Sequence, residues 1–131
     1  MDAVDEKIIE FLKKDSRMSY VDIAKEINLT EGAIRSRVHR LLRDNVIKSF
    51  TIETTADIKA VVMVASSRAK PTTQVANSIK KLGVDMIFEV SGNYDIICFV
   101  REESVERTNE IVEKIRKLEG VTDTYTSMVL K

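Results

Sequence analysis

Apolar residues in the first third of the chain recur every three or four positions, which is the period of an amphipathic helix. Three such stripes are present: Val4, Ile8, Phe11 and Leu12; Ile23, Ala24 and Ile27; and Ile34, Val38 and Leu41. A residue that can cap a helix precedes each stripe, namely Asp2, Ser19 and Thr30. Ser19 and Asp22 also resemble a capping box in which Asp replaces the usual Glu. The pattern predicts three helices with a tight turn at 28–29, in helix-turn-helix order.

The residues after the third stripe lose this period. Asn45 is expected to end the third helix in a left-handed conformation. Residues 46–52 favour a strand that would form a small wing. A short connection follows that contains neither glycine nor proline. We therefore predict a winged helix-turn-helix domain over residues 1–53, a linker over 54–58 and a second domain over 59–131.

The second domain alternates between strand and helix patterns. Strands are predicted over 60–65, 84–90, 94–101 and 121–130, with helices from Pro71 to Gly83 and from Val105 to about Gly120. In the second strand, the alternation is expected to put Val84, Met86, Phe88 and Val90 on one face. The order strand-helix-strand occurs twice, which is typical of a ferredoxin-like βαββαβ domain with an antiparallel sheet and both helices on one face. The predicted fold class is α+β.

Two of the predicted strands are apolar on both faces. Residues 61–65 and 96–100 consist of apolar side chains throughout. Helices on one side of the sheet would leave the other side bare, and a large exposed apolar face promotes association. We expect a second copy of the chain to cover it in a two-fold dimer; the alternative is that the wing folds back as a lid. A dimer would present two helix-turn-helix units to DNA half-sites about one helical turn apart.

Composition limits the classes of function. The chain has 131 residues, of which 44% are hydrophobic and 32% charged, so it is expected to be globular rather than disordered. No apolar run approaches the ~20 residues that span a bilayer, and the charged N-terminus has no signal-peptide pattern. We therefore expect a cytoplasmic protein without a membrane partner, in which the single cysteine, Cys98, is an inert core residue. One histidine, no phosphate-binding glycine loop and no nucleophile-base set argue against an enzyme, a metal site or a cofactor.

The net charge is zero, yet residues 31–45 carry four arginines against two acidic residues. The side opposite the third apolar stripe carries small residues near its start and basic residues further along. This arrangement suits a helix that enters a DNA major groove. Base contacts are expected from Thr30, Gly32, Ala33, Arg35 and Ser36, and phosphate contacts from Ser19, Tyr20, Arg37, Arg40, Arg43 and Lys48. His39 is expected to face phosphate or solvent rather than a metal. Arg37 lies near the edge of the apolar stripe, so an internal ion pair is its equally weighted alternative.

Three blocks of the sequence, which together span nearly the whole chain, match the pattern of one family. They are Val4–Ser19; Val21–Ala24 with Leu29–Thr30, Ala33–Ile34, Arg37–Val38, Arg40–Leu41 and Val46–Lys48; and Ser91–Asp95 with the apolar strand Ile96–Val100. On these residues the chain resembles the leucine-responsive and asparagine-responsive (Lrp/AsnC) transcription regulators. The resemblance implies an N-terminal DNA-binding domain and a C-terminal domain that dimerises, senses an amino acid and often assembles into tetramers or octamers. Asn45 and Ser49 stand where glycine is common, and the short linker resembles a compact archaeal-type subgroup.

A second candidate site comprises Gly92, Asn93, Tyr94 and Asp95. Here Asp95 would accept hydrogen bonds from the amino group of a free amino acid, while backbone N–H groups of the turn would meet its carboxylate. The resemblance implies that hydroxyls of the last strand, from Thr124 and Thr126 on one face and Ser127 on the other, line the same pocket. The alternative is an ordinary hairpin whose aspartate bonds its own turn. The predicted function is an amino-acid-responsive transcription regulator; the alternative is an amino-acid-binding module that acts on an enzyme through protein-protein contact.

Overall fold

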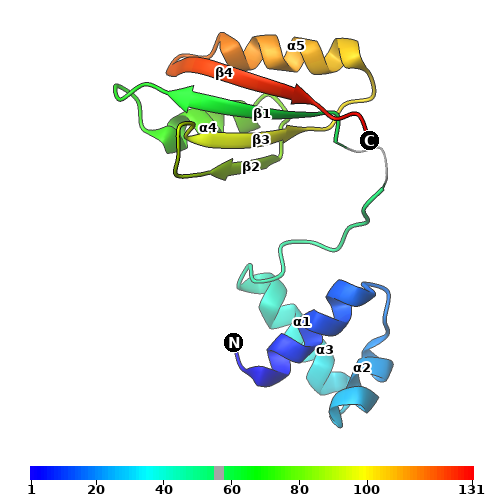
Figure 1. Cartoon of the computed structure of the whole chain (residues 1–131). Helices are drawn as coiled ribbons and strands as arrows, with labels where there is room; N and C mark the ends of the chain where they lie inside the picture. The colour runs from blue at the N-terminus through cyan, green and yellow to red at the C-terminus, as the bar shows by residue number, and fades with distance from the viewer. Residues whose placement is uncertain (55–57) are drawn as a thin grey trace. The chain divides into compact units, whose positions relative to one another are not determined.

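The chain forms two compact units, Met1–Glu53 and Thr54–Lys131 (Figure 1). The structure is a computed structural model that describes residues 1–54 and 58–131. The predicted linker at 54–58 includes residues 55–57, which lie outside the described residues.

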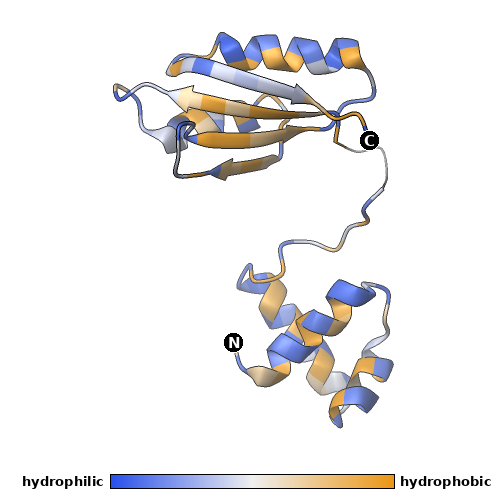
Figure 2. Ribbon diagram, viewed as in Figure 1, coloured by the Kyte–Doolittle hydropathy of each residue, from blue (hydrophilic) through white to orange (hydrophobic). Residues whose placement is uncertain are grey.

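The N-terminal unit contains the three predicted helices: α1 (Ala3–Lys14), α2 (Tyr20–Ile27) and α3 (Glu31–Arg43). Their apolar stripes meet in one core. Figure 2 shows hydrophobic residues interspersed with hydrophilic ones along each helix. Asp2 and Asp5 form a capping box at the start of α1. The hydroxyls of Ser19 and Thr30 accept backbone N–H bonds at the starts of α2 and α3, at 3.0 Å and 3.2 Å respectively. Asn28 adopts a left-handed conformation (φ 60°) and makes the turn between α2 and α3.

The segment after α3 differs from the prediction. Asn45 has the expected left-handed backbone (φ 59°), but the strand predicted over residues 46–52 is not formed. The N–H groups of Val46 and Ile47 instead donate to the carbonyl of Leu41, at 2.9 Å and 3.0 Å, and close the end of the helix. The rest of the segment has no neighbouring strand in its own unit with which to pair. The predicted wing is therefore wrong.

The C-terminal unit has the predicted βαββαβ order and is of the α+β class. Its elements are β1 (Ala60–Ser66), α4 (Thr72–Lys80), β2 (Met86–Glu89), β3 (Ile96–Val100), α5 (Val105–Arg116) and β4 (Val121–Met128). The strands lie in the order β2-β3-β1-β4 and all pair antiparallel. Both helices cover the same face of the sheet, as predicted (Figure 1).

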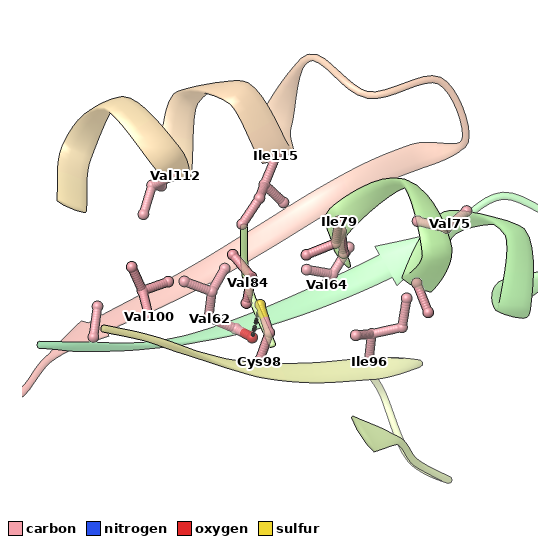
Figure 3. Close-up of a cluster of buried hydrophobic side chains, with 12 residues drawn as sticks. Val62, Val64, Val75, Ile79, Val84, Ile96, Cys98, Val100, Val112 and Ile115 are labelled. Carbon is pink, nitrogen blue, oxygen red and sulfur yellow. Dashed lines mark hydrogen bonds between the residues drawn. The ribbon is translucent and has the colours of Figure 1, made fainter. Parts of the chain in front are cut away.

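Side chains of the central strands alternate between this covered face and an open one. On the covered face, Val62 and Cys98 are opposite each other in the register and are fully buried. Side chains of α4 and α5, such as Ile79 and Ile115, point down onto them (Figure 3). Burial raises the pKa of the Cys98 thiol to about 11, and its Sγ lies 3.5 Å from the Val62 carbonyl oxygen. Cys98 is thus the inert core residue that the sequence predicted.

The open face carries the other half of each strand. Its apolar members are Val61, Met63 and Ala65 of β1, Ile97 and Phe99 of β3, Met86 and Phe88 of β2, and Tyr125 of β4. Phe88 and Tyr125 are 52% and 59% exposed, and the strands β1 and β3 are apolar along their length in Figure 2. No described helix or strand of the C-terminal unit packs on this face.

One prediction about β2 is wrong. Val84, which was expected to share a face with Phe88, precedes the strand and is buried in the core under the helices. Phe88 lies on the open face, where its ring meets Phe99 edge-on with centroids 6.2 Å apart. Within the strand, Ile87 packs against the core and pairs with Cys98. Alternation does not extend across Asp85 because the regular strand begins only at Met86.

Candidate functional site

The outward side of α3 is exposed and polar. Ile34, Val38 and Leu41 are buried beneath it, while the predicted contact residues Gly32, Arg35, Ser36, His39, Arg40 and Arg43 are exposed and Ala33 is half-buried. Around Gly32, no atom lies within 4 Å of where a Cβ would be. A ligand can therefore approach the helix backbone closely at its first turn, and the basic side chains follow further along.

Arg35 is held by two neighbours. Its Nη2 donates to Glu31 Oε1, one helical turn earlier, and its guanidinium carbon lies 5.2 Å from the ring centroid of Tyr20 in α2. Arg35 and Tyr20 were predicted to contact DNA, whereas Glu31 was not. The spacing of Glu31 and Arg35 by four residues was the available signal, because such pairs face each other on a helix.

Arg37 forms the internal ion pair that was its alternative interpretation. Its Nη1 lies 2.7 Å from Asp2 Oδ2 and 3.0 Å from Asp5 Oδ1. Arg40 joins the same network through Nη2, which lies 2.7 Å from Asp5 Oδ2. The side chain of Asp5 is only 1% exposed, whereas that of Arg40 is 44% exposed. The network fastens α3 to the start of α1 and leaves Arg40 partly open to solvent.

Within this network, Asp2, Asp5 and Arg37 shift one another's pKa values. The hydrogen bond from Arg37 lowers the pKa of Asp2 to about 2. Burial by itself raises the pKa of Asp5, but hydrogen bonds from Arg37 and from the Asp2 backbone outweigh it, so the pKa of Asp5 is lowered. The same contacts, from Asp2 first, raise the pKa of Arg37. All of these groups are therefore charged at neutral pH.

The remaining predicted DNA contacts lie around the same helices. The hydroxyls of Ser19 and Thr30 are exposed and cap their helices. Arg43 is 74% exposed, and within residues 1–54 and 58–131 its one ion pair is with its neighbour Asp44, at 3.3 Å. Lys48 is exposed beyond the end of α3.

The second candidate site is the 91–95 turn between β2 and β3. Gly92 has a positive φ of 145°. The carbonyl of Asp95 accepts from Val90 N across the turn at 2.9 Å. Its side chain bonds β1 instead of the turn: Oδ2 accepts from Ser66 N at 2.8 Å and from Ser66 Oγ at 3.2 Å. Its N–H donates to the Val64 carbonyl at 2.9 Å. Tyr94 places its ring 6.5 Å from that of Tyr125, on the other side of β1. The turn is thus anchored to the end of β1, and Asn93 is exposed at its tip.

The hydroxyl residues of β4 are divided between the two faces. Thr124 and Thr126 pair with Val64 and Val62 of the covered face, and Ser127 pairs with Val61 of the open face. Thr124 is thus level with the end of β1 that anchors the 91–95 turn, while Thr126 and Ser127 lie further along. Thr124 Oγ1 also accepts from Arg116 Nε at 3.2 Å, and both residues line a pocket of about 200 Å³.

Among the described residues, no group of three or more His, Cys, Asp or Glu side chains could hold a metal ion. In that same part of the chain, the helices are too short or too polar to cross a bilayer.

Both halves of the chain match known domains. Residues 1–42 match the AsnC-type helix-turn-helix domain, and residues 59–131 match the Lrp/AsnC ligand binding domain. The HTH-type transcriptional regulator LysM of Saccharolobus solfataricus is 40% identical over 100% of this chain and 94% of its own length. The protein of the same name from Sulfurisphaera tokodaii is 39% identical, over 100% and 96%.

Solved structures share the fold at low sequence identity. The leucine response regulatory protein LrpA of Mycobacterium tuberculosis superposes with a TM-score of 0.85 at 20% identity, covering 100% of this chain and 93% of that one. A transcriptional regulator from Neisseria meningitidis, solved as a complex with L-Met, gives a TM-score of 0.77 at 21% identity, over 100% and 90%. The relatives are transcription regulators and not enzymes, as predicted for this chain. The chain belongs to the Lrp/AsnC family of transcription regulators, with a DNA-binding helix-turn-helix domain followed by an amino-acid-binding domain.

Proposed function

We propose that the protein reads two DNA half-sites as a dimer and that a free amino acid changes its affinity for them. The DNA-binding proposal depends on the outer side of α3, where Gly32 allows close approach and Arg43 pairs, among the described residues, with its neighbour Asp44 alone. Because Arg37 pairs with Asp2 and Asp5, the basic residues left to contact phosphates are Arg40, Arg43 and Lys48, beside the predicted contacts of Ser19 and Tyr20. A DNA target also fits the cytoplasmic localisation expected from the sequence.

The open face of the C-terminal sheet supports the dimer. It presents eight apolar side chains, two of them aromatic rings more than half exposed. At ~25 cal/mol per Å² of apolar surface, covering such a face is strongly favourable. A second copy supplies an identical face, so a two-fold axis buries both at once.

The proposed site for the amino acid is the 91–95 turn together with the adjacent end of β4. In the described part of the chain, Asp95 bonds Ser66 through Oδ2, and we assign Oδ1 to a ligand ammonium. Gly92 and Asn93 are exposed, and their backbone N–H groups are the proposed donors to a carboxylate. The L-Met complex of the Neisseria meningitidis regulator supports a free amino acid as the class of ligand. A thermal-shift screen of the twenty amino acids identifies which one stabilises this protein.

An electrophoretic mobility shift on the gene's own upstream region tests the proposal. Arg35→Ala should weaken binding because it removes a side chain from the groove side of α3, while the surface control Glu106→Ala on α5 should bind as the unaltered protein does. The amino acid found by thermal shift should change the binding. Equal binding by both variants would contradict the assignment of α3 as the reading helix.

A further inference from the structure

An acidic side chain stands at the start of the helix that is proposed to enter DNA. Glu31 is the first residue of α3, where an anion gains a little from the helix dipole. The same place is unfavourable next to phosphates, because a negative charge there repels the duplex. A carboxylate on this side of the helix therefore reduces affinity for every sequence unless it meets a donor on the DNA.

Glu31 does not stand alone. Its Oε1 accepts from Nη2 of Arg35, and the two side chains remain 39% and 53% exposed. The ring of Tyr20, 5.2 Å from the guanidinium carbon, is a second contact that restrains Arg35. The guanidinium is thus restrained before any DNA arrives, which lowers the conformational cost of placing its fork on a base.

The pair presents donors beside an acceptor, and one base pair has the complementary pattern. In the major groove, guanine offers two acceptors, O6 and N7, and its partner cytosine offers the N4 amino donor. An arginine meets guanine through two hydrogen bonds, and a carboxylate accepts from cytosine N4. An A·T pair offers only one acceptor on the purine, beside an amino donor that would face the guanidinium.

We propose that Glu31 is a specificity-determining residue, and that Glu31 and Arg35 together read one G·C base pair in each half-site. Arg35 donates to guanine O6 and N7, and Glu31 accepts from cytosine N4. The repulsion between Glu31 and phosphates makes binding weaker wherever that base pair is missing, which sharpens discrimination. This inference rests on the proposed function, in which the start of α3 lies in the major groove.

The test uses the full chain and a matched control. Glu10 of α1 also pairs with a basic residue one turn later, Lys14, at 3.5 Å, so Glu10→Ala makes the same charge change away from α3. The unaltered protein, Glu31→Ala and Glu10→Ala are each used to select sites from a randomised duplex library. Dissociation constants are then measured by fluorescence anisotropy on the selected duplex and on versions with each G·C pair replaced by A·T. Thermal unfolding verifies that the variants are folded.

For the unaltered protein and Glu10→Ala, replacing one particular G·C pair should weaken binding about tenfold or more. For Glu31→Ala the same replacement should cost less than about threefold, and affinity for unrelated duplex should rise. Equal discrimination by Glu31→Ala and the unaltered protein would overturn the inference while leaving DNA binding intact. Failure of the unaltered protein to enrich any sequence would overturn the proposed function itself, and the inference with it.

Discussion

The carboxylate of Asp5, buried in the first turn of α1, accepts a hydrogen bond of 3.0 Å from Nη1 of Arg37 in α3. The two residues are 32 positions apart in the sequence. A buried carboxylate is stable only when it is paired and hydrogen-bonded. The pair therefore fixes the orientation of α3 against α1 and, with it, the direction in which the exposed side of α3 points.

Removing this carboxylate should destabilise the N-terminal unit. Asp5→Ala leaves two arginines without their shared partner and removes one half of the capping box. Breaking a buried pair costs about 3–5 kcal/mol, but Arg37 and Arg40 remain 26% and 44% exposed and can be hydrated, so we expect about 2 kcal/mol. Urea unfolding, followed by circular dichroism, measures this loss of unfolding free energy. Glu6→Ala, at an exposed neighbouring position, is the control. Equal midpoints for the two variants would show that the network contributes nothing to stability.

The same network predicts a pH dependence. The pKa of Asp2 falls from 3.8 to about 2 through Arg37, and that of Asp5 is also lowered. A carboxyl group with a lower pKa in the folded state stabilises the fold above its unfolded pKa and loses that effect as pH falls through the folded pKa. The Tm should therefore decline between about pH 4 and about pH 2. The difference in Tm between the unaltered protein and Arg37→Gln should narrow over this range, and a difference that stays constant would contradict the pairing.

The open sheet face predicts self-association that one charge can prevent. Met63 lies in the central strand β1 between Ile97 and Tyr125, so Met63→Lys would bury a charge in the proposed dimer interface. Sedimentation velocity at micromolar concentration should give a dimer or larger assembly for the unaltered protein and the 14.9 kDa monomer for Met63→Lys. Val105→Lys, at an exposed position on α5, should leave the assembly unchanged. An unaltered protein that sediments as a monomer would exclude the interface.

Substitution of Asp95 tests whether this side chain contacts the amino-acid ligand or only stabilises the 91–95 turn. Asp95→Ala removes both bonds to Ser66 and should lower the Tm by loosening the turn from β1. If Asp95 also holds the ligand ammonium, the Tm increase given by the stabilising amino acid should disappear in this variant. Glu106→Ala, at an exposed position on α5, should keep that increase. A lower Tm with the full ligand-induced increase would make Asp95 structural only.

Local patterns were sufficient for most of the fold. The caps at Asp2, Ser19 and Thr30 and the left-handed Asn45 depend on residues within a few positions of each other. The helices follow from their periodic stripes, and the βαββαβ order from the alternation of periods. The strand predicted over 46–52 failed because a strand requires a partner, and the pattern of one segment does not reveal whether a partner is within reach.

The candidate site was harder to predict for the same reason. Nothing near Arg37 in the sequence indicates that it forms an ion pair with Asp5, which lies 32 residues earlier. The hydrogen bonds from Ser66 to Asp95 likewise join positions 29 residues apart, and only the pairing of β1 with β3 brings them together. Glu31 and Arg35, by contrast, are four residues apart on one helix, so their pairing was predictable from spacing alone.

The salt dependence of DNA affinity tests most directly whether the exposed side of α3 meets the duplex. Anisotropy titrations on the upstream region at several salt concentrations give the slope of log affinity against log salt for the unaltered protein, Arg43→Ala and Arg107→Ala. Arg107 is exposed on α5 and is the control. The account predicts a steep slope that Arg43→Ala reduces by about 0.9 for each bound copy of the chain and that Arg107→Ala leaves unchanged. Identical slopes for all three proteins would contradict it.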